Sequence, residues 1–549
     1  MFIYLRLTVF CFLCTISSSL CDICVTCSCS TTLDGLPIID CHERDLERND
    51  MLISELLMLD ENKVNNKLIL SKNQIINLSP HLLKKLRLLK SIDLSENFMK
   101  QIYIILYTNL NSLEDLNLSK NAITTFDDLL LREVPSLLTL NLSYNQIDTI
   151  QHTIGETITN INSLDLSHNN ISNFPNKFFD SLTNLQYLDL SFNRINSLEE
   201  YGLTHLNSLK TVYINNNFLT SLHMKMFPKS LLNLYSGYNL ITEIFYEPSE
   251  IEVLNIEYNR LFKIRSNAIA LKHLKHLNVS GNILSDFPNI LCENLKTLDI
   301  SCNNLSSIPE TLSTSNFPLL ATLNVSKNPI RNLMFRSELN LQLFVASNIS
   351  ILETIDKATF AKLRAPAKEC INLIISNNKG LSLIHEEAFK HMNLCSLDIS
   401  NNQIAYIAQK LVPCNTNSVT CNVNLQGNPL KCNCSLQWIL DDMMPKLYHT
   451  QLNLLDNLRC AWPPQISKTR MLHWYGWKDR VFCTKMLDFN EKMKIDATIS
   501  QNGVITFNST PGLLAVLGVA IVVFSILIIV GIIWTQRLHI KRRRVNRKF

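Results

Sequence analysis

Leucine and polar residues alternate in a short pattern that is clearest at residues 185–195, which read LQYLDLSFNRI. Successive side chains of a β-strand point to opposite faces, so Leu188 and Leu190 are expected to point inward while Asp189 points outward. Asn193 follows the strand and brings two amide donors and one acceptor to the turn. Because an amide is costly to bury without partners, we expect Asn193 to hydrogen-bond to the backbone of a neighbouring segment.

The same pattern recurs along most of the chain, over residues 61–427. Sixteen segments align on their asparagine, and the spacing is 24 residues six times in succession before it varies between 20 and 30. The aligned asparagines are Asn73, Asn97, Asn121, Asn145, Asn169, Asn193, Asn217, Asn239, Asn259, Asn282, Asn303, Asn328, Asn348, Asn378, Asn402 and Asn428. Amphipathic helices, the alternative, would need a 3.6-residue period, which this pattern lacks.

The form L-x-x-L-x-L-x-x-N-x-L resembles the leucine-rich repeat. The resemblance implies an α/β leucine-rich repeat solenoid, with a curved parallel β-sheet and an irregular convex side. The broken period after Asn217 indicates either a kink that binds a partner or a drifted scaffold, and extra loop is expected around residues 362–368. One coil buries too little apolar surface to offset its own ordering entropy, so the coils must stack and their ends need caps.

Cysteines gather where the N-terminal cap is required, in residues 20–60. The spacing resembles the cysteine-rich N-terminal cap of extracellular leucine-rich repeat proteins, whose core would here be Cys27, Cys29 and Cys41. Cys21 and Cys24 stand beside them, so one of the five is surplus. A zinc cluster is the competing interpretation, but a secreted chain favours disulfides.

A second cysteine-rich cap is predicted at residues 428–483. Residues 428–438 read NPLKCNCSLQW and resemble the opening of the cysteine-flanked C-terminal cap. That resemblance implies pairing of Cys432 with Cys460 and of Cys434 with Cys483. Between the caps, three further pairs are expected from closeness in sequence or in the repeat: Cys292 with Cys302, Cys370 with Cys395, and Cys414 with Cys421. The surplus cysteine of the N-terminal cap then remains as a free thiol or an inter-chain bridge.

The two ends of the chain predict a type I membrane protein of the plasma membrane. Residues 1–19 have the form of a signal peptide, with an apolar run followed by small residues. A polar stalk is expected at 484–512, and residues 513–534 contain no charge and are long enough for one transmembrane helix. The tail at 535–549 holds seven cations and no acid, which favours a cytoplasmic position and contact with anionic lipid.

Ten sequons for N-glycosylation are spread along the chain: Asn77, Asn117, Asn141, Asn170, Asn278, Asn304, Asn324, Asn348, Asn433 and Asn508. Four of them, Asn117, Asn141, Asn278 and Asn324, fall on outward strand positions, where glycans would obstruct the concave face. A partner would then use the lateral faces, or the concave stretch between Asp165 and Asn255. The candidate partner-binding residues are Asp165, Asp189 and Tyr213, although Asp and Asn are also common as solvated residues at such positions.

Charge and motifs exclude several classes of function. The tail and leader hold eight of the 51 cations, so the remainder has 43 cations against 47 acids and gives no support for nucleic-acid binding. We find no nucleophile elbow, zinc-protease motif or phosphate loop, so we expect no catalytic residues, cofactor or metal site.

From leader to tail, the chain resembles single-pass leucine-rich repeat receptors, with an ectodomain like those of Toll-like receptors and cell-adhesion proteins. It departs from Toll-like receptors in its tail, because 15 residues cannot fold into a signalling domain. Three functions therefore remain. The chain is an adhesion or recognition protein that binds an extracellular protein partner, a Toll-like co-receptor or decoy that signals through another chain, or a structural matrix-contacting protein.

Overall fold

The computed structural model describes the repeats and most of both caps. The described residues are 24, 26–45, 66–78, 86–102, 110–152, 159–198, 202–245, 249–264, 272–367, 369–412, 422–477 and 480–483. The predicted leader, stalk, membrane span and tail lie outside them, as do Cys21, Cys414, Cys421 and the sequon at Asn508. Within the described residues no helix is both long and apolar enough to cross a membrane. The chain divides into two compact units, one holding the chain up to Cys432 together with Trp438–Tyr475, the other Asn433–Gln437 and the residues from Gly476 onward.

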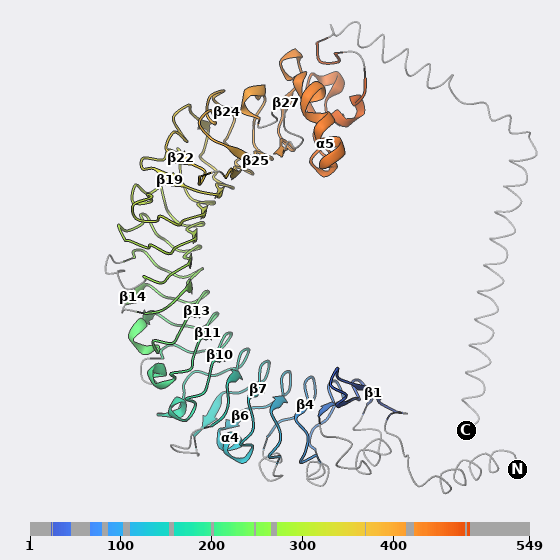
Figure 1. The fold of residues 1–549 in the computed structure, drawn as a ribbon, viewed down its shortest axis with the longest axis vertical. Coiled ribbons are helices and arrows are strands. Elements are labelled where there is room, and N and C mark those ends of the chain that lie inside the picture. Colours follow the sequence, from blue (N-terminus) through green and yellow to red (C-terminus); the bar gives the residue numbers. More distant parts are fainter. Residues whose placement is uncertain are drawn as a thin grey trace, which may run out of the picture. The chain divides into compact units, whose positions relative to one another are not determined.

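The first unit is built on one sheet of 18 strands. Every neighbouring pair is parallel except the first, β1 with β2. The strands of this sheet are β1 (Ser28–Thr31), β2 (Pro37–Asp40), β3 (Lys67–Ile69), β4 (Ser91–Asp93), β5 (Asp115–Asn117), β7 (Thr139–Asn141), β9 (Ser163–Asp165), β10 (Tyr187–Asp189), β11 (Thr211–Tyr213), β13 (Asn233–Tyr235), β15 (Val253–Asn255), β16 (His276–Asn278), β17 (Thr297–Asp299), β18 (Thr322–Asn324), β20 (Leu343–Val345), β23 (Ile371–Ile374), β25 (Leu394–Asp398) and β26 (Val423–Asn424). The strands line the inner side of the stacked coils (Figure 1).

The opposite side of the coils is irregular. It carries short parallel pairs, β6 (Thr125–Asp127) with β8 (Thr149–Gln151), β12 (Ser221–His223) with β14 (Glu243–Phe245), β19 (Leu339–Asn340) with β22 (Leu363–Arg364), and β21 (Thr354–Ile355) with β24 (Leu383–Ile384). Among the described residues it also carries helix α4 (Leu129–Glu133) and 3₁₀ helices at Phe178–Ser181, Leu203–His205, Met224–Met226 and Gln409–Leu411. The leucine-rich repeat solenoid predicted from the sequence is confirmed. The loop expected at 362–368 instead begins with β22, whose Leu363 is buried, and residue 368 lies outside the description.

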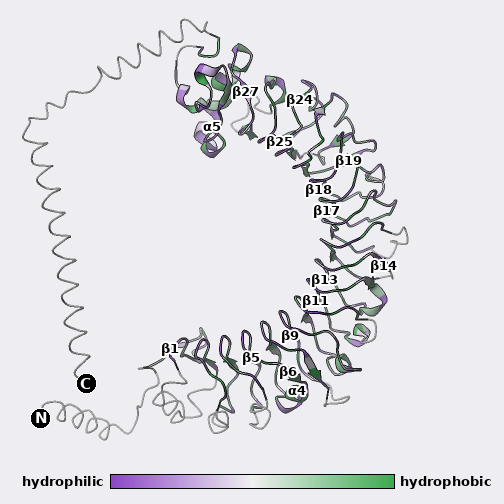
Figure 2. Cartoon of the chain, turned by 180° about the vertical axis from the view of Figure 1, so that it is seen from behind, coloured by the Kyte–Doolittle hydropathy of each residue, from purple (hydrophilic) through white to green (hydrophobic). Residues whose placement is uncertain are grey.

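The core is a stack of equivalent side chains contributed by every coil. Leu188 and Leu190 are fully buried, while Asp189 between them is half-buried on the strand surface. Hydrophobic and hydrophilic positions accordingly alternate along the coils (Figure 2). Because each coil shares its apolar side chains with both neighbours, the core runs the length of the unit.

The aligned asparagines join the coils to one another by hydrogen bonds, as predicted. We call this row of side chains the asparagine ladder. Asn193 is 6% exposed and donates from Nδ2 to the carbonyl oxygens of Leu190 in its own coil (3.1 Å) and of Leu166 in the preceding coil (2.9 Å). Its Oδ1 accepts the N–H of Ile171 at 3.0 Å. Equivalent bonds recur at Asn121, Asn145, Asn169 and most other aligned asparagines. Each amide therefore satisfies backbone groups that the turn would otherwise bury unpaired.

One residue assigned to the asparagine ladder from the sequence, Asn348, is not part of it. Asn348 is exposed and has φ = +57°, the backbone conformation found one residue before each ladder asparagine, so the ladder position is Ile349. Isoleucine has no amide, so the bond to the preceding coil is made by the N–H of Ser347, which donates to Ser326 Oγ at 2.9 Å. Toward the following coil, Asn378 Oδ1 accepts the N–H of Ile349 at 2.7 Å, and the hydroxyl oxygens of Ser347 and Ser376 lie 3.1 Å apart.

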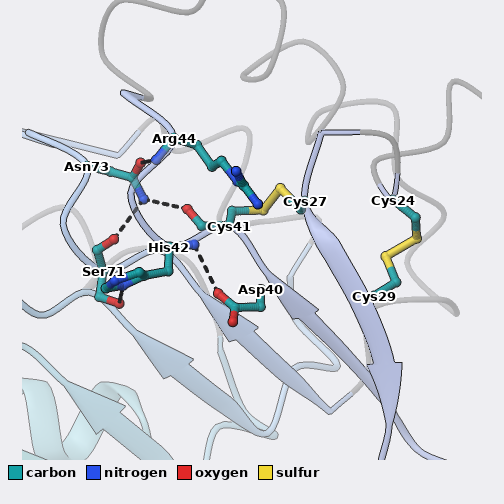
Figure 3. The surroundings of a disulfide bond; sticks show 9 residues. All are labelled: Cys24, Cys27, Cys29, Asp40, Cys41, His42, Arg44, Ser71 and Asn73. Atoms are coloured by element: carbon teal, nitrogen blue, oxygen red, sulfur yellow. Dashed lines mark hydrogen bonds between the residues drawn. A yellow bond between two sulfur atoms is a disulfide. The ribbon is translucent and has the colours of Figure 1, made fainter. Parts of the chain in front are cut away.

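The N-terminal cap is an antiparallel hairpin of β1 and β2 held by two disulfides, Cys24–Cys29 and Cys27–Cys41. The cap also continues the ladder. Asn73 donates to the carbonyl oxygen of Cys41 at 2.8 Å, and its Oδ1 accepts the N–H of Arg44 at 2.7 Å (Figure 3). Among the described strands, β1 pairs only with β2, so the hairpin forms this end of the sheet.

At the other end, a cap of short helices follows the last coil. It contains β27 (Leu430–Lys431) paired with β28 (Cys460–Trp462), helix α5 (Met444–Thr450), a π-helical turn at Ile439–Met443, and 3₁₀ helices at Leu452–Leu454, Pro464–Ile466 and Met471–Trp474. Cys432 is bonded to Cys460 in this unit. Ile439, Met444 and Leu447 are fully buried, so the cap has its own apolar core.

The second unit contains the other disulfide of the C-terminal cap, Cys434–Cys483, and the 3₁₀ helix Cys434–Leu436. Asn433 lies at the start of that helix, where its Oδ1 accepts the N–H of Ser435 at 3.1 Å. Gln437 Oε1 accepts the N–H of Phe482 at 2.9 Å.

The internal cysteines that the structure describes are a bonded pair and two free thiols. Cys370 and Cys395 form a disulfide between neighbouring strand segments. The expected pair of Cys292 with Cys302 is wrong, since both are free. Cys292 precedes β17 and Cys302 follows it, so an extended strand separates two residues whose Cα atoms would have to lie within about 7 Å to be bridged.

Candidate binding surface on the concave sheet

The three partner-binding residues proposed from the sequence lie in consecutive positions across the sheet. Strand register places Asp165 of β9 opposite Asp189 of β10, and Asp189 opposite Tyr213 of β11. The row continues through Tyr235 of β13 to Asn255 of β15. Neighbouring strands are about 4.8 Å apart, so these side chains are immediate neighbours.

Two tyrosines that the sequence analysis did not single out complete this surface. The rings of Tyr213 and Tyr235 are stacked with centroids 4.4 Å apart and planes 4° apart. The ring of Tyr187, on the first position of β10, lies 5.6 Å from that of Tyr213. Tyr187 donates its hydroxyl to Asp189 Oδ2 at 3.4 Å. The signal for Tyr235 was present in the sequence, but Ser236 interrupts the apolar pattern beside it and weakens that coil.

The carboxylate of Asp189 is held in a partly dehydrated position. Burial raises its pKa, although the N–H of Ser191, 2.8 Å from Oδ1, acts in the opposite direction. Burial likewise raises the pKa of Tyr213, and that of Tyr187 more strongly. Among the described residues, no Lys or Arg forms an ion pair with Asp165 or Asp189. The surface therefore presents carboxylates without a cation of its own.

The sequons on the sheet flank this stretch. Asn117 and Asn141 end β5 and β7 before it, and Asn278 and Asn324 end β16 and β18 after it. Each of these Oδ1 atoms accepts the backbone N–H two residues ahead, which fixes the amide on the concave side. From β9 to β15 no strand residue is a sequon asparagine.

We expect glycans on Asn117, Asn141, Asn278 and Asn324, leaving β9 to β15 uncovered. Mass spectrometry of glycopeptides from the cell-expressed chain measures occupancy at each site. Occupancy near completion at all four would leave this stretch as the accessible part of the sheet. Unmodified Asn117 and Asn278 would contradict the expectation and reopen the rest of the concave face.

A second row of aromatic residues runs beside the tyrosines, one residue before five of the ladder asparagines. The ring of His168 is stacked between those of Tyr144 (3.8 Å) and Phe192 (4.0 Å), and Tyr238 is stacked on Tyr258 (4.7 Å). All five have positive φ, a conformation that favours Gly and Asn. We call this row, from residue 144 to residue 258, the aromatic column. The sequence analysis missed it, although the residue before each aligned asparagine can be read directly from the repeat.

The stacked histidine, His168, predicts that the stability of the fold decreases in acid. Burial lowers the pKa of His168 below its ordinary 6.5, although Asp189 and Asp165 act in the opposite direction. In the unfolded chain the pKa returns toward 6.5, so the unfolded state binds more protons and the contribution of His168 to stability is lost as the pH falls below that value. We expect wild-type melting temperature to fall between about pH 7 and pH 5 more than that of His168→Phe or His168→Gln.

The two variants separate titration from stacking. Both remove the titrating group, but only phenylalanine preserves the stack, so at pH 7 the glutamine variant should melt at a lower temperature than the phenylalanine variant. Thermal unfolding at both pH values measures this. Parallel pH dependence of the wild type and both variants would contradict the role assigned to His168.

A shallow hollow lies on the sheet beyond the tyrosines, over β13 to β18. Its lining includes Tyr235, His276, Asp299, Asn278 and Asn324. The last two are sequon residues, and their Nδ2 atoms donate to Glu257 (3.0 Å) and to Asp299 (2.9 Å). Glycans on them would stand at this hollow, so it is a weaker candidate than the tyrosine surface. No group of metal-ligating side chains occurs among the described residues.

Comparison with known proteins agrees with this architecture. Models of the leucine-rich repeat match residues 135–149, 159–217 and 294–315. The CD180 antigen of Mus musculus is 25% identical over 252 residues, which are 44% of this chain and 33% of that protein. The chain thus spans about a third of the length of this curated relative. The matched models describe repeats and name no enzyme.

Two solved structures are similar in fold. The crystal structure of a TLR13–ssRNA13 complex has a TM-score of 0.58 at 19% identity, over 75% of this chain and 60% of that one. A leucine-rich repeat protein from Leptospira interrogans has a TM-score of 0.52 at 22% identity, over 74% of this chain and 97% of that one. At these identities the likeness shows the leucine-rich repeat fold alone.

Proposed function

We propose that this chain is a cell-surface recognition protein that binds an extracellular protein partner through the concave strands from β9 to β15. The observation that carries the proposal is the continuous row of Asp165, Asp189, Tyr213 and Tyr235 in a stretch of sheet without sequons. Tyrosine is favoured in protein interfaces because it combines a large apolar ring with a polar tip. An open sheet of this size suits a macromolecule better than a small substrate.

Residues 513–534 are proposed to anchor the chain as a single helix, with the repeats outside the cell and the basic tail against anionic lipid. Adhesion to another cell and a Toll-like co-receptor or decoy role are both compatible with this arrangement. The second role is the alternative function. In that role the chain would act through a partner with its own signalling domain.

Photocrosslinking on living cells tests the proposal. A photoreactive amino acid replaces Tyr213 in the full chain, and a matched control places it at Asp299, which lies on the same sheet between two sequons. We expect a protein crosslinked specifically from position 213. Equal products from both positions, or none from 213, would contradict binding through β9 to β15.

The identity of the crosslinked protein separates the two roles. A protein of the same cell with a cytoplasmic signalling domain would support the co-receptor role. A protein of the opposing cell, captured equally well when residues 535–549 are deleted, would support adhesion.

A further inference from the structure

The aromatic column is interrupted at one coil. Phe192 and Tyr238 stand on either side of Asn216, which occupies the equivalent position with the same backbone conformation, φ = +53°. Phe192 stacks on His168 with one face, and Tyr238 stacks on Tyr258 with one face. The second face of each ring is therefore directed along the column toward the coil of Asn216, where the short amide does not replace a ring.

The gap in the aromatic column is wide enough for one planar chemical group. Neighbouring rings in the column lie 3.8–4.7 Å apart, so two steps leave roughly 8–9 Å between the rings of Phe192 and Tyr238. A planar group midway would lie about 4–4.5 Å from each ring, within the roughly 6 Å over which a cation is attracted to an aromatic face. Phe192 and Tyr238 are 46% and 48% exposed, so the opening is accessible.

Carboxylates lie on both sides of this opening. Asp189 precedes Phe192 by three residues and faces Tyr213, which shares a coil with Asn216. On the other side, Glu257 lies against the residue before Tyr238, since a Cβ built on Gly237 would be 2.9 Å from Glu257 Cγ. The nearest cation in the sequence, Arg194, is exposed. The charge of the surroundings is thus complementary to a cationic group supplied from outside.

We propose that the space over Asn216, between Phe192 and Tyr238, is a slot for an arginine side chain of the protein partner. Arginine is chosen because a guanidinium is planar, stacks on aromatic faces and hydrogen-bonds to carboxylates, whereas an ammonium is compact and more strongly hydrated. This inference rests on the proposed function, because it assigns the chemistry by which a partner on β9 to β15 is held.

Filling the slot from within the chain tests the inference. Asn216→Tyr would complete the column in a backbone conformation that Tyr144, Tyr238 and Tyr258 already adopt, so the variant is expected to fold. The matched control is Lys120→Tyr, which extends the column beyond Tyr144 and leaves the slot open. The probe is a labelled Gly-Arg-Gly-Arg-Gly peptide, titrated into the full chain in detergent, with the corresponding lysine peptide in a second arm.

We expect the arginine peptide to bind wild type and Lys120→Tyr equally, and Asn216→Tyr at least about tenfold more weakly. Asp189→Asn should also weaken binding, whereas Asp93→Asn should not. Asp93 is a suitable control because it occupies the same position on β4 and likewise accepts the N–H two residues ahead, from Ser95. Unchanged binding to Asn216→Tyr, or equal binding of the arginine and lysine peptides, would overturn the slot.

A second variant, a neutral ligand and a crosslinking comparison distinguish the remaining outcomes. Should Asn216→Tyr fail to reach the cell surface, Tyr238→Leu removes one wall instead, and full arginine-peptide affinity in that variant would overturn the slot. Binding of a neutral oligosaccharide that Asn216→Tyr abolishes, without arginine-peptide binding, would overturn the choice of occupant. A partner crosslinked from position 213 with equal yield in wild type and Asn216→Tyr would leave the proposed function standing and remove the slot.

Discussion

Asn193→Leu is expected to lower the free energy of unfolding by about 1–3 kcal/mol, the cost of one buried unpaired group. Leucine is close to asparagine in size but forms no hydrogen bonds, so the N–H of Ile171 would remain buried without its partner. The carbonyl of Leu166 would lose one of its two donors and keep Asn169 Nδ2. Because both groups belong to the preceding coil, the damage extends beyond the substituted coil.

Chemical denaturation of the purified chain, together with its yield at the cell surface, measures this effect. The matched control is Arg194→Leu, which introduces the same side chain at the next, exposed position and should change stability by no more than about 0.5 kcal/mol. Wild-type stability and surface yield in Asn193→Leu would count against the ladder as the connection between coils.

Removal of the Cys432–Cys460 bond, by replacing both residues with alanine, is expected to cost about 3–4 kcal/mol. The bond closes a loop across 28 positions, and closure of that length restricts the unfolded chain by this order of energy. It also ties β27 to β28. Loosening the cap would expose the apolar end of the last coil, where Val423 and Leu425 are buried.

Thermal unfolding and limited proteolysis of the full chain test this expectation, with cleavage predicted to begin in the C-terminal cap. Cys302→Ser is the matched control, since Cys302 is a free thiol and its replacement breaks no bond. A double variant that melts and resists protease like the wild type would show that the cap is held by its packing alone.

The strands could be located from the sequence because the pattern that defines them is also their physical cause. Two leucines flanking one polar residue bury alternate side chains, so Leu188 and Leu190 marked β10 directly. The error at Asn348 has a matching explanation. An asparagine at the turn position before the ladder is common for its own reason, its tolerance of positive φ, and the pattern could not tell it from a ladder residue when Ile349 followed.

The candidate surface was only partly predictable. Asp165, Asp189 and Tyr213 could be placed on one face by counting along the repeat, but the stacking of Tyr213 on Tyr235 depends on the register between coils of unequal length. The aromatic column could have been found by aligning the residue before each asparagine. The free state of Cys292 and Cys302 could not, since sequence distance does not reveal the strand that holds them apart.

The isoleucine at position 349 has a mechanical consequence. A stack of coils tied by amide crosslinks behaves as an elastic arc, and its bending stiffness depends on each tie between neighbouring coils. At Ile349 the amide that would bond to the preceding coil is missing, and the N–H of Ser347 donates to Ser326 Oγ in its place. The connection to the following coil keeps its amide, because Asn378 Oδ1 accepts the N–H of Ile349. The arc is therefore expected to be most compliant between the coils of Asn328 and Ile349. Deformation imposed by a bound partner would be concentrated between these two coils rather than spread evenly along the sheet.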